Sequence, residues 1–73
     1  MRITVKLFAS YRVGRFKEAV REYPVGTTVT EVLQSLNIAE LRGIALVNGK
    51  PAPLSQVLKE CDTMTLVPLI SGG

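Results

Sequence analysis

The chain has 73 residues, of which 47% are hydrophobic, and it carries a formal net charge of +3. This length predicts one domain, and the hydrophobic content excludes a disordered chain. Histidine is absent and Cys61 is the single cysteine, so neither an internal disulfide nor a cysteine zinc site can form. Because histidine is the commonest general base, self-contained catalysis is not expected, and neither is a metal site. The sequence lacks a signal-peptide pattern and a membrane-spanning run, which predicts a cytoplasmic location.

The positive charge is local. Arg12, Arg15, Lys17 and Arg21, less one for Glu18, account for the whole excess of +3. Such a segment could meet an acidic partner, but a solvated loop and strand surface is the favoured interpretation. No nucleic-acid-binding motif accompanies it, so nucleic acid is not an expected partner.

The first half of the chain predicts a hairpin. Residues 2–8 alternate with a period of two, which places Ile3, Val5 and Leu7 on one face of a strand and Phe8 on the other. A loop over 9–15 leads to a second strand over 16–23. Neither face of that second strand is uniformly apolar, which indicates a bulge or an edge position.

A helix is predicted over residues 28–36. Thr28 and Glu31 have the spacing of a capping box, in which each side chain accepts a hydrogen bond from a backbone N–H of the first turn. Apolar residues then recur at helical spacing, which predicts one buried face, and Asn37 is a plausible helix end. The members of this stripe are Val29, Val32, Leu33 and Leu36.

The second half of the chain predicts two more strands. Residues 44–47 are apolar on both faces, so we expect this strand to be covered on both sides, and Asn48-Gly49 then signals a tight turn. The apolar positions between 54 and 58 predict one helical turn against the core. Residues 63–68 form the last strand, and Pro68 predicts an edge position or the end of pairing.

These elements predict an α+β fold with a single domain over residues 1–73. One helix must cover one face of a mixed four- to five-stranded sheet. We expect the last strand to lie centrally and to pair in parallel with the first.

The end of the sequence carries the candidate functional group. Ser71, Gly72 and Gly73 follow the last strand directly, and they predict a thin, flexible tail over about residues 70–73. Phe8, Val67 and Leu69 have the outward phase, which predicts an exposed apolar patch near this tail. Patches of that kind usually mark partner surfaces.

Four stretches resemble the ubiquitin-related β-grasp sulfur carriers, the MoaD/ThiS family, and especially the small subunit of molybdopterin synthase. They are residues 5–9, 24–29, 47–50 and 61–73, and together they extend the resemblance over the whole chain. Two positions depart from the family pattern. Cys61 replaces a usual glycine, and Val67-Pro68-Leu69 keeps one proline where an aromatic and two prolines are frequent.

The resemblance implies a carrier protein rather than an enzyme, with no bound cofactor. A partner resembling a ubiquitin-activating enzyme would use ATP to adenylate Gly73, and a sulfur donor enzyme would convert it to a thiocarboxylate. Gly72 and Ser71 would form the insertable tip, and Leu69 and Ile70 would seat the base of the tail against the partner. The acceptor would be the large subunit of molybdopterin synthase or its tungsten-pterin equivalent.

Several alternatives stay open at this point. A sulfur carrier for thiamin would serve thiazole synthase instead. A protein-conjugating ubiquitin-like modifier would use the same adenylation step and then form a bond to a lysine of another protein. A non-covalent β-grasp interaction module would undergo neither adenylation nor conjugation.

Overall fold

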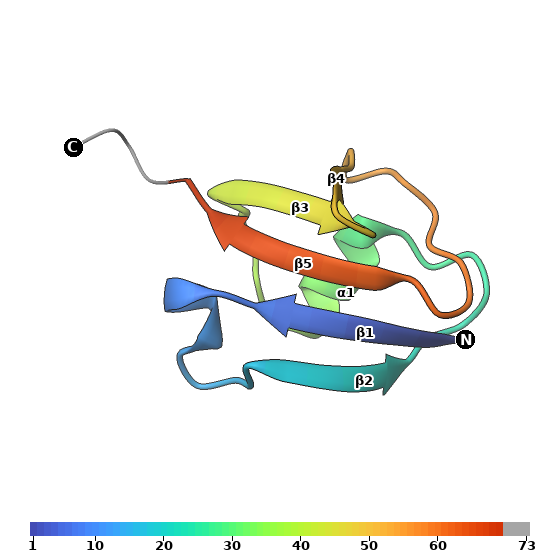
Figure 1. Ribbon diagram of the computed structural model, residues 1–73, viewed down its shortest axis with the longest axis horizontal. Helices are drawn as coiled ribbons and strands as arrows, with labels where there is room; N and C mark the ends of the chain where they lie inside the picture. The colour runs from blue at the N-terminus through green and yellow to red at the C-terminus, as the bar shows by residue number, and fades with distance from the viewer. Residues whose placement is uncertain (70–73) are drawn as a thin grey trace.

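The computed structural model describes residues 1–69, and the expected mixed sheet with one helix on one face is confirmed (Figure 1). The sheet has five strands in the order β2-β1-β5-β3-β4. β1 and β5 are parallel neighbours, as expected, and the other pairs are antiparallel. The elements in chain order are β1 (Arg2–Leu7), the 3-10 helix η1 (Ala9–Arg12), β2 (Glu18–Glu22), α1 (Val29–Ser35), β3 (Gly43–Val47), β4 (Lys50–Pro51) and β5 (Thr63–Pro68).

The core lies between α1 and one face of the sheet. Val29 and Val32 of the helix are completely buried, as are Leu7 of β1 and Leu66 of β5. Full burial of a side chain of this size contributes about 1.5–3 kcal/mol. The opposite face of the sheet has no second layer within residues 1–69, and we call it the open face.

The ends of α1 are fixed by local hydrogen bonds. The capping box is confirmed, because Thr28 Oγ1 accepts from Glu31 N at 3.3 Å and Glu31 Oε1 accepts from Thr28 N at 3.0 Å. At the other end Asn37 has φ of 59°, and Ile38 N donates to Leu33 O at 3.0 Å. This left-handed residue and its bond form a Schellman motif, which confirms Asn37 as the helix end.

Two expectations for the second half are wrong. β3 is covered on one face only, and Ile44 is 42% exposed on the open face. An apolar strand is buried on both faces only when each face has a covering layer, and α1 is the only α-helix within residues 1–69. No helical turn forms over residues 54–58, because backbone groups there pair with the start of α1. Gln56 O accepts from Val29 N at 3.0 Å, and Leu58 N donates to Thr27 O at 2.9 Å.

The first half adds two details. β2 is an outermost strand, which confirms the edge position, although its bounds are narrower than the expected 16–23. The expected loop over 9–15 contains η1, which buries Tyr11 against the end of β5. Within residues 1–69, no helix has the length and apolar character needed to cross a lipid bilayer.

Candidate functional site

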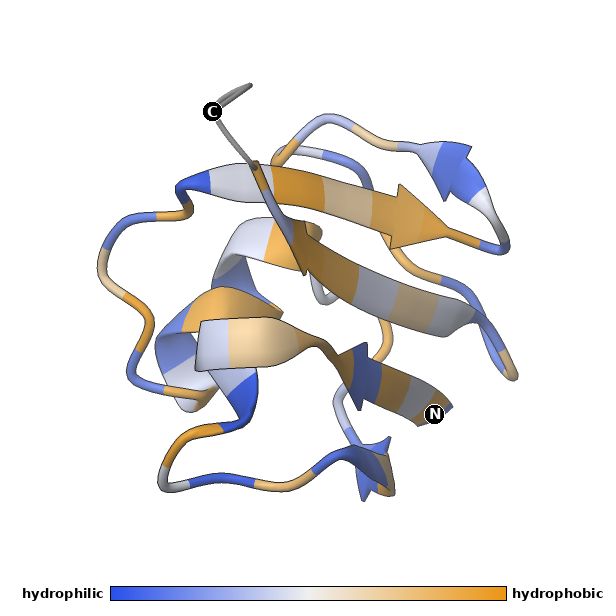
Figure 2. Cartoon of the chain, turned by 60° about the vertical axis from the view of Figure 1, so that its left-hand side comes forward, coloured by the Kyte–Doolittle hydropathy of each residue, from blue (hydrophilic) through white to orange (hydrophobic). Residues whose placement is uncertain are grey.

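An apolar patch lies on the open face where β5 ends. Phe8 is 41% exposed, Ile44 42% and Leu69 67%, and Val67 is half-buried among them. Ile44 lies opposite Val67 in the β3–β5 ladder, and Phe8 N donates to Leu66 O, which places Phe8 beside Val67 on the other flank. We call these four residues the open-face patch. Figure 2 shows apolar residues on both β3 and β5 where these strands lie side by side.

The sequence analysis correctly predicted that three members of this patch, Phe8, Val67 and Leu69, face away from the core, but it did not predict this for Ile44. Ile44 belongs to a strand that is apolar at every position from 44 to 47, so alternation could not show which face is open. The number of helices was the available signal, because one helix covers only one face of a sheet. The role of the patch in partner binding stays a prediction.

Arg12 supports the exposed aromatic ring of the patch. Its guanidinium carbon lies 5.6 Å from the centre of the Phe8 ring, and its Nε donates to Leu7 O at 3.0 Å. The hydrogen bond holds the cation over the ring, where the interaction contributes about 0.5–1 kcal/mol at an exposed site. One member of the basic segment therefore borders the patch.

The other arginines of that segment have partners within the fold. Arg15 lies at the carboxyl end of α1, where its Nε donates to Leu36 O at 2.8 Å and its Nη1 donates to Tyr11 O at 3.2 Å. Arg21 lies over the rings of Phe16 and Tyr23, at 5.7 and 5.9 Å. These contacts agree with the interpretation of the segment as a solvated loop and strand surface.

Pro68 ends the ladder between β1 and β5. In a parallel ladder, a residue that donates to position 66 accepts from position 68. Phe8 N donates to Leu66 O, but Pro68 has no N–H to return to Phe8 O. Phe8 O accepts instead from Tyr11 N at 3.2 Å, which starts η1. Pro68 thus ends pairing on this side, as expected.

The remaining candidate residues lie outside the described residues 1–69, and they are Ile70, Ser71, Gly72 and Gly73. The described chain stops one residue after Pro68, where Leu69 N donates to Arg42 O at 3.2 Å. β5 ends at the side of the sheet opposite the N-terminus (Figure 1).

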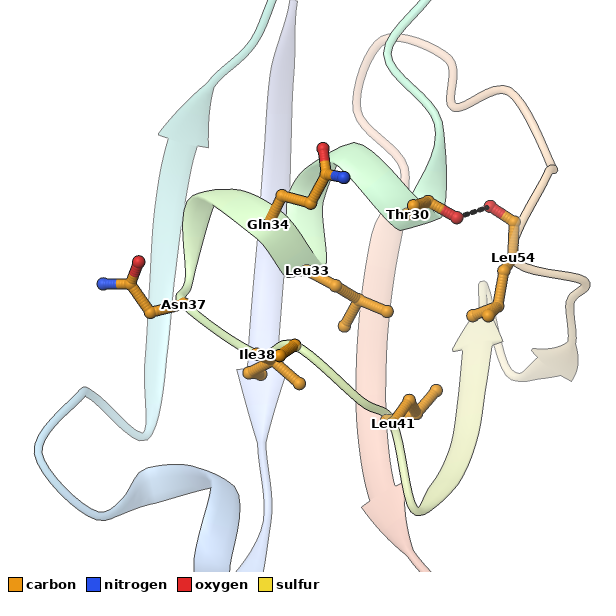
Figure 3. A pocket seen from close by; sticks show the side chains of 8 residues that line it. Thr30, Leu33, Gln34, Asn37, Ile38, Leu41 and Leu54 are labelled. Carbon is orange, nitrogen blue, oxygen red and sulfur yellow. Dashed lines mark hydrogen bonds between the residues drawn. The ribbon is translucent and has the colours of Figure 1, made fainter.

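A hollow with a volume of about 540 Å³ lies on the side of the sheet that α1 covers. Figure 3 shows it between α1 and Leu54, with the side chains of Leu33, Ile38 and Leu41 along it. None of its lining residues titrates, so it holds no acid or base. The eight lining residues are Thr30, Leu33, Gln34, Asn37, Ile38, Ala39, Leu41 and Leu54.

Cys61 and the acidic side chains form no metal centre among residues 1–69. Cys61 is exposed, has φ of 67°, and donates its backbone N–H to Arg2 O at 2.9 Å. A left-handed residue in a turn is usually glycine, which explains why the family pattern has glycine at this position.

The strand order and the crossing helix define a β-grasp, ubiquitin-like fold, and similar solved structures confirm it. The model described as "ThiS family" matches residues 5–73. The chain therefore belongs to the ThiS family, and its resemblance to the ubiquitin-related sulfur carriers is confirmed at that level. No curated protein shows significant sequence similarity to it.

Three solved structures illustrate the likeness. SAMP1 from Haloferax volcanii has a TM-score of 0.81 and 22% identity, with 100% of each chain covered. A putative molybdopterin converting factor subunit 1 from Pyrococcus furiosus has a TM-score of 0.79 and 23% identity, over 96% of this chain and 99% of that one. One chain in a complex of molybdopterin-converting factor subunits 1 and 2 from Helicobacter pylori 26695 has a TM-score of 0.67 and 20% identity, with 100% of each chain covered.

Proposed function

We propose that the chain is a sulfur carrier whose reactive group is the carboxylate of Gly73. An activating enzyme joins this carboxylate to the AMP part of ATP and releases pyrophosphate. Sulfide, or its equivalent supplied by a donor enzyme, then attacks the acyl carbon and displaces AMP, which leaves a C-terminal thiocarboxylate. The carboxylate is first made electrophilic, and its sulfur product is the nucleophile that a biosynthetic partner uses.

The observation that carries this proposal is the open-face patch at the end of β5. The central strand leads directly from this patch toward the terminal Gly72-Gly73. A partner that binds Phe8, Ile44 and Leu69 would therefore hold the protein beside the point where the tail leaves the sheet. The chain has no histidine, and the hollow beside α1 is lined by no acid or base, so the proposal assigns the chemistry to the partner.

The partners follow from the same scheme. They are an ATP-dependent adenylyltransferase, a sulfur donor enzyme, and the large subunit of a synthase that accepts the sulfur. Two similar structures are molybdopterin converting factor subunits, which favours a molybdopterin or tungsten-pterin pathway. The thiazole synthase of thiamin biosynthesis is the alternative acceptor, because the matching family is that of ThiS.

A second candidate function is protein modification. A similar structure from Haloferax volcanii is described as small archaeal modifier protein 1, with a TM-score of 0.79 and 21% identity over 94% of this chain. In that function the adenylated Gly73 would acylate a lysine amine of another protein, and AMP would be released.

Intact-mass measurement distinguishes these functions. The purified protein is incubated with each adenylyltransferase of this type from its own genome, ATP and a sulfur donor. A carrier gains the mass difference between sulfur and oxygen, confined to its C-terminal peptide, whereas a modifier appears on lysines of other proteins. Deletion of Gly73, or addition of one residue after it, should block the reaction and leave the melting temperature unchanged. If the wild type stays unmodified with every enzyme, the interaction-module alternative replaces the proposal.

A further inference from the structure

Gly43 differs from the other glycines that the structure describes. The others have positive φ and open space around the position of a Cβ atom, so they serve the conformation of turns; they are Gly14, Gly26 and Gly49. At Gly43 the space is filled. A Cβ atom there would overlap the carbonyl oxygen of Val67, and it would lie 2.9 Å from Pro68 Cα and 3.0 Å from the Tyr11 hydroxyl oxygen.

These three neighbours all belong to the place where β5 ends. Gly43 is the first residue of β3, and it pairs with Pro68, the last residue of β5. The next bond along the two chains joins Leu69 N to Arg42 O at 3.2 Å. Because the ladder to β1 has already stopped at Pro68, β3 supplies the last backbone hydrogen bonds to β5, and η1 packs against the same end. The close approach at Gly43 therefore decides how Leu69 is held.

A side chain at position 43 cannot be accommodated by a rotamer change. Two of its three neighbours are backbone atoms of β5, so the strands themselves would have to separate. Separation would weaken the bond between Leu69 N and Arg42 O and displace Leu69. A displacement of about 1 Å at a reacting group can lower a rate by about 100-fold.

We infer that Gly43 is a positioning residue for the reactive end: the space it leaves for Val67, Pro68 and Tyr11 fixes the position of Leu69, from which the chain continues to Gly73. The inference rests on the proposed function. It assigns to Gly43 a role beyond packing, since the open-face patch would bind the partner while Gly43 sets the position of Leu69 at the end of β5.

The test compares Gly43→Ala with Leu33→Ala, at a temperature where circular dichroism shows that both variants are folded. Leu33 is a core residue of α1 with 4% exposure, and it lies away from the end of β5, so its variant controls for lost stability. In thiocarboxylate formation by the activating enzyme, Gly43→Ala should lower kcat about 10- to 100-fold and change KM by less than about twofold. Leu33→Ala should keep the wild-type kcat.

Amide hydrogen exchange supplies a readout that is independent of the reaction. The Leu69 amide of the wild type should be protected, and Gly43→Ala should raise its exchange at least about tenfold while the β1 amides stay protected. If Gly43→Ala does not fold, the wild-type measurement decides: a protected Leu69 amide supports the inference, and free exchange overturns it. Wild-type kcat in Gly43→Ala also overturns it. If no enzyme modifies the wild type, the proposed function is refuted instead. The exchange data then still show whether Gly43 is needed to hold Leu69 in place.

Discussion

Asn48 donates a hydrogen bond from its Nδ2 to Oδ1 of Asp62, with 2.8 Å between the two atoms. The other carboxylate oxygen of Asp62 accepts from Lys59 N at 2.8 Å, and Asn48 Oδ1 accepts from Thr63 N at 3.0 Å. Asp62 is 9% exposed, so few water molecules can replace these partners. The pair thus joins the turn after β3 to the start of β5.

Replacing Asp62 with alanine should lower the free energy of unfolding. Asn48 Nδ2 and Lys59 N would lose their acceptor in a largely buried place, which costs about 1–3 kcal/mol. Chemical denaturation measures the change, and Ser55→Ala at an exposed position is the control, with an expected change within about 0.5 kcal/mol. Equal stability of the two variants would show that water satisfies the donors.

The capping box predicts a coupled pair of substitutions. Thr28→Ala should cost about 1 kcal/mol, because Glu31 N loses its acceptor at the first turn of α1. Glu31→Ala frees Thr28 N in the same way. Since the two residues share one motif, the double variant should lose less stability than the sum of the single ones. Strict additivity in thermal or denaturant unfolding would argue against a reciprocal box.

Arg15 and Lys17 should differ although both are exposed and basic. Arg15→Ala removes the donors to Leu36 O and Tyr11 O, so it should destabilise the fold by about 1 kcal/mol. Lys17→Ala should change the free energy of unfolding by less than about 0.5 kcal/mol. The same two variants tested against the activating enzyme show whether the basic segment also affects binding.

A charged residue in the open-face patch should have little effect on the stability of the free protein but should weaken binding to a partner. Phe8→Asp and Ile44→Asp should each weaken binding to the activating enzyme at least about tenfold, because central apolar contacts of an interface commonly contribute more than 1 kcal/mol. Both melting temperatures should change little, since the side chains are about 40% exposed.

Val25→Asp is the matched control for the patch. Val25 is 90% exposed and follows β2. Because β2 runs antiparallel to β1 and β5, its carboxyl end lies at the opposite end of the strands from the carboxyl end of β5. Its variant should bind the enzyme like the wild type. Calorimetry that finds all three variants alike would refute a docking role for the patch.

Local patterns carried the parts of the fold that could be predicted. Thr28 and Glu31 specify a helix start within four residues, and alternation of Ile3, Val5 and Leu7 specifies a strand and its buried face. The parallel pairing of β1 and β5 followed from the order of the elements. Each of these inferences needed only neighbours in sequence or the general rules of sheet topology.

The parts that were missed depend on distant segments. Tyr11 is buried because η1 packs on the end of β5, and a four-residue element has no periodicity to reveal this. In the sequence, Gly43 cannot be distinguished from a glycine of a linker, because its pairing with Pro68 is known only from the structure. Ile44 was predicted to be buried because its strand is apolar at every position from 44 to 47, so alternation could not show which face is exposed. The sequence of residues 70–73 indicated a reactive end, and these residues lie outside the described part of the chain.

The place of β5 in the sheet has a mechanical consequence. A partner that draws the tail into its active site pulls β5 along its own axis. Hydrogen bonds to β1 on one side and β3 on the other are then loaded in shear, so many must break together. An edge strand pulled away sideways would lose its bonds one at a time. The fold is therefore strongest against force along β5, which is the strand that the proposed partner would pull.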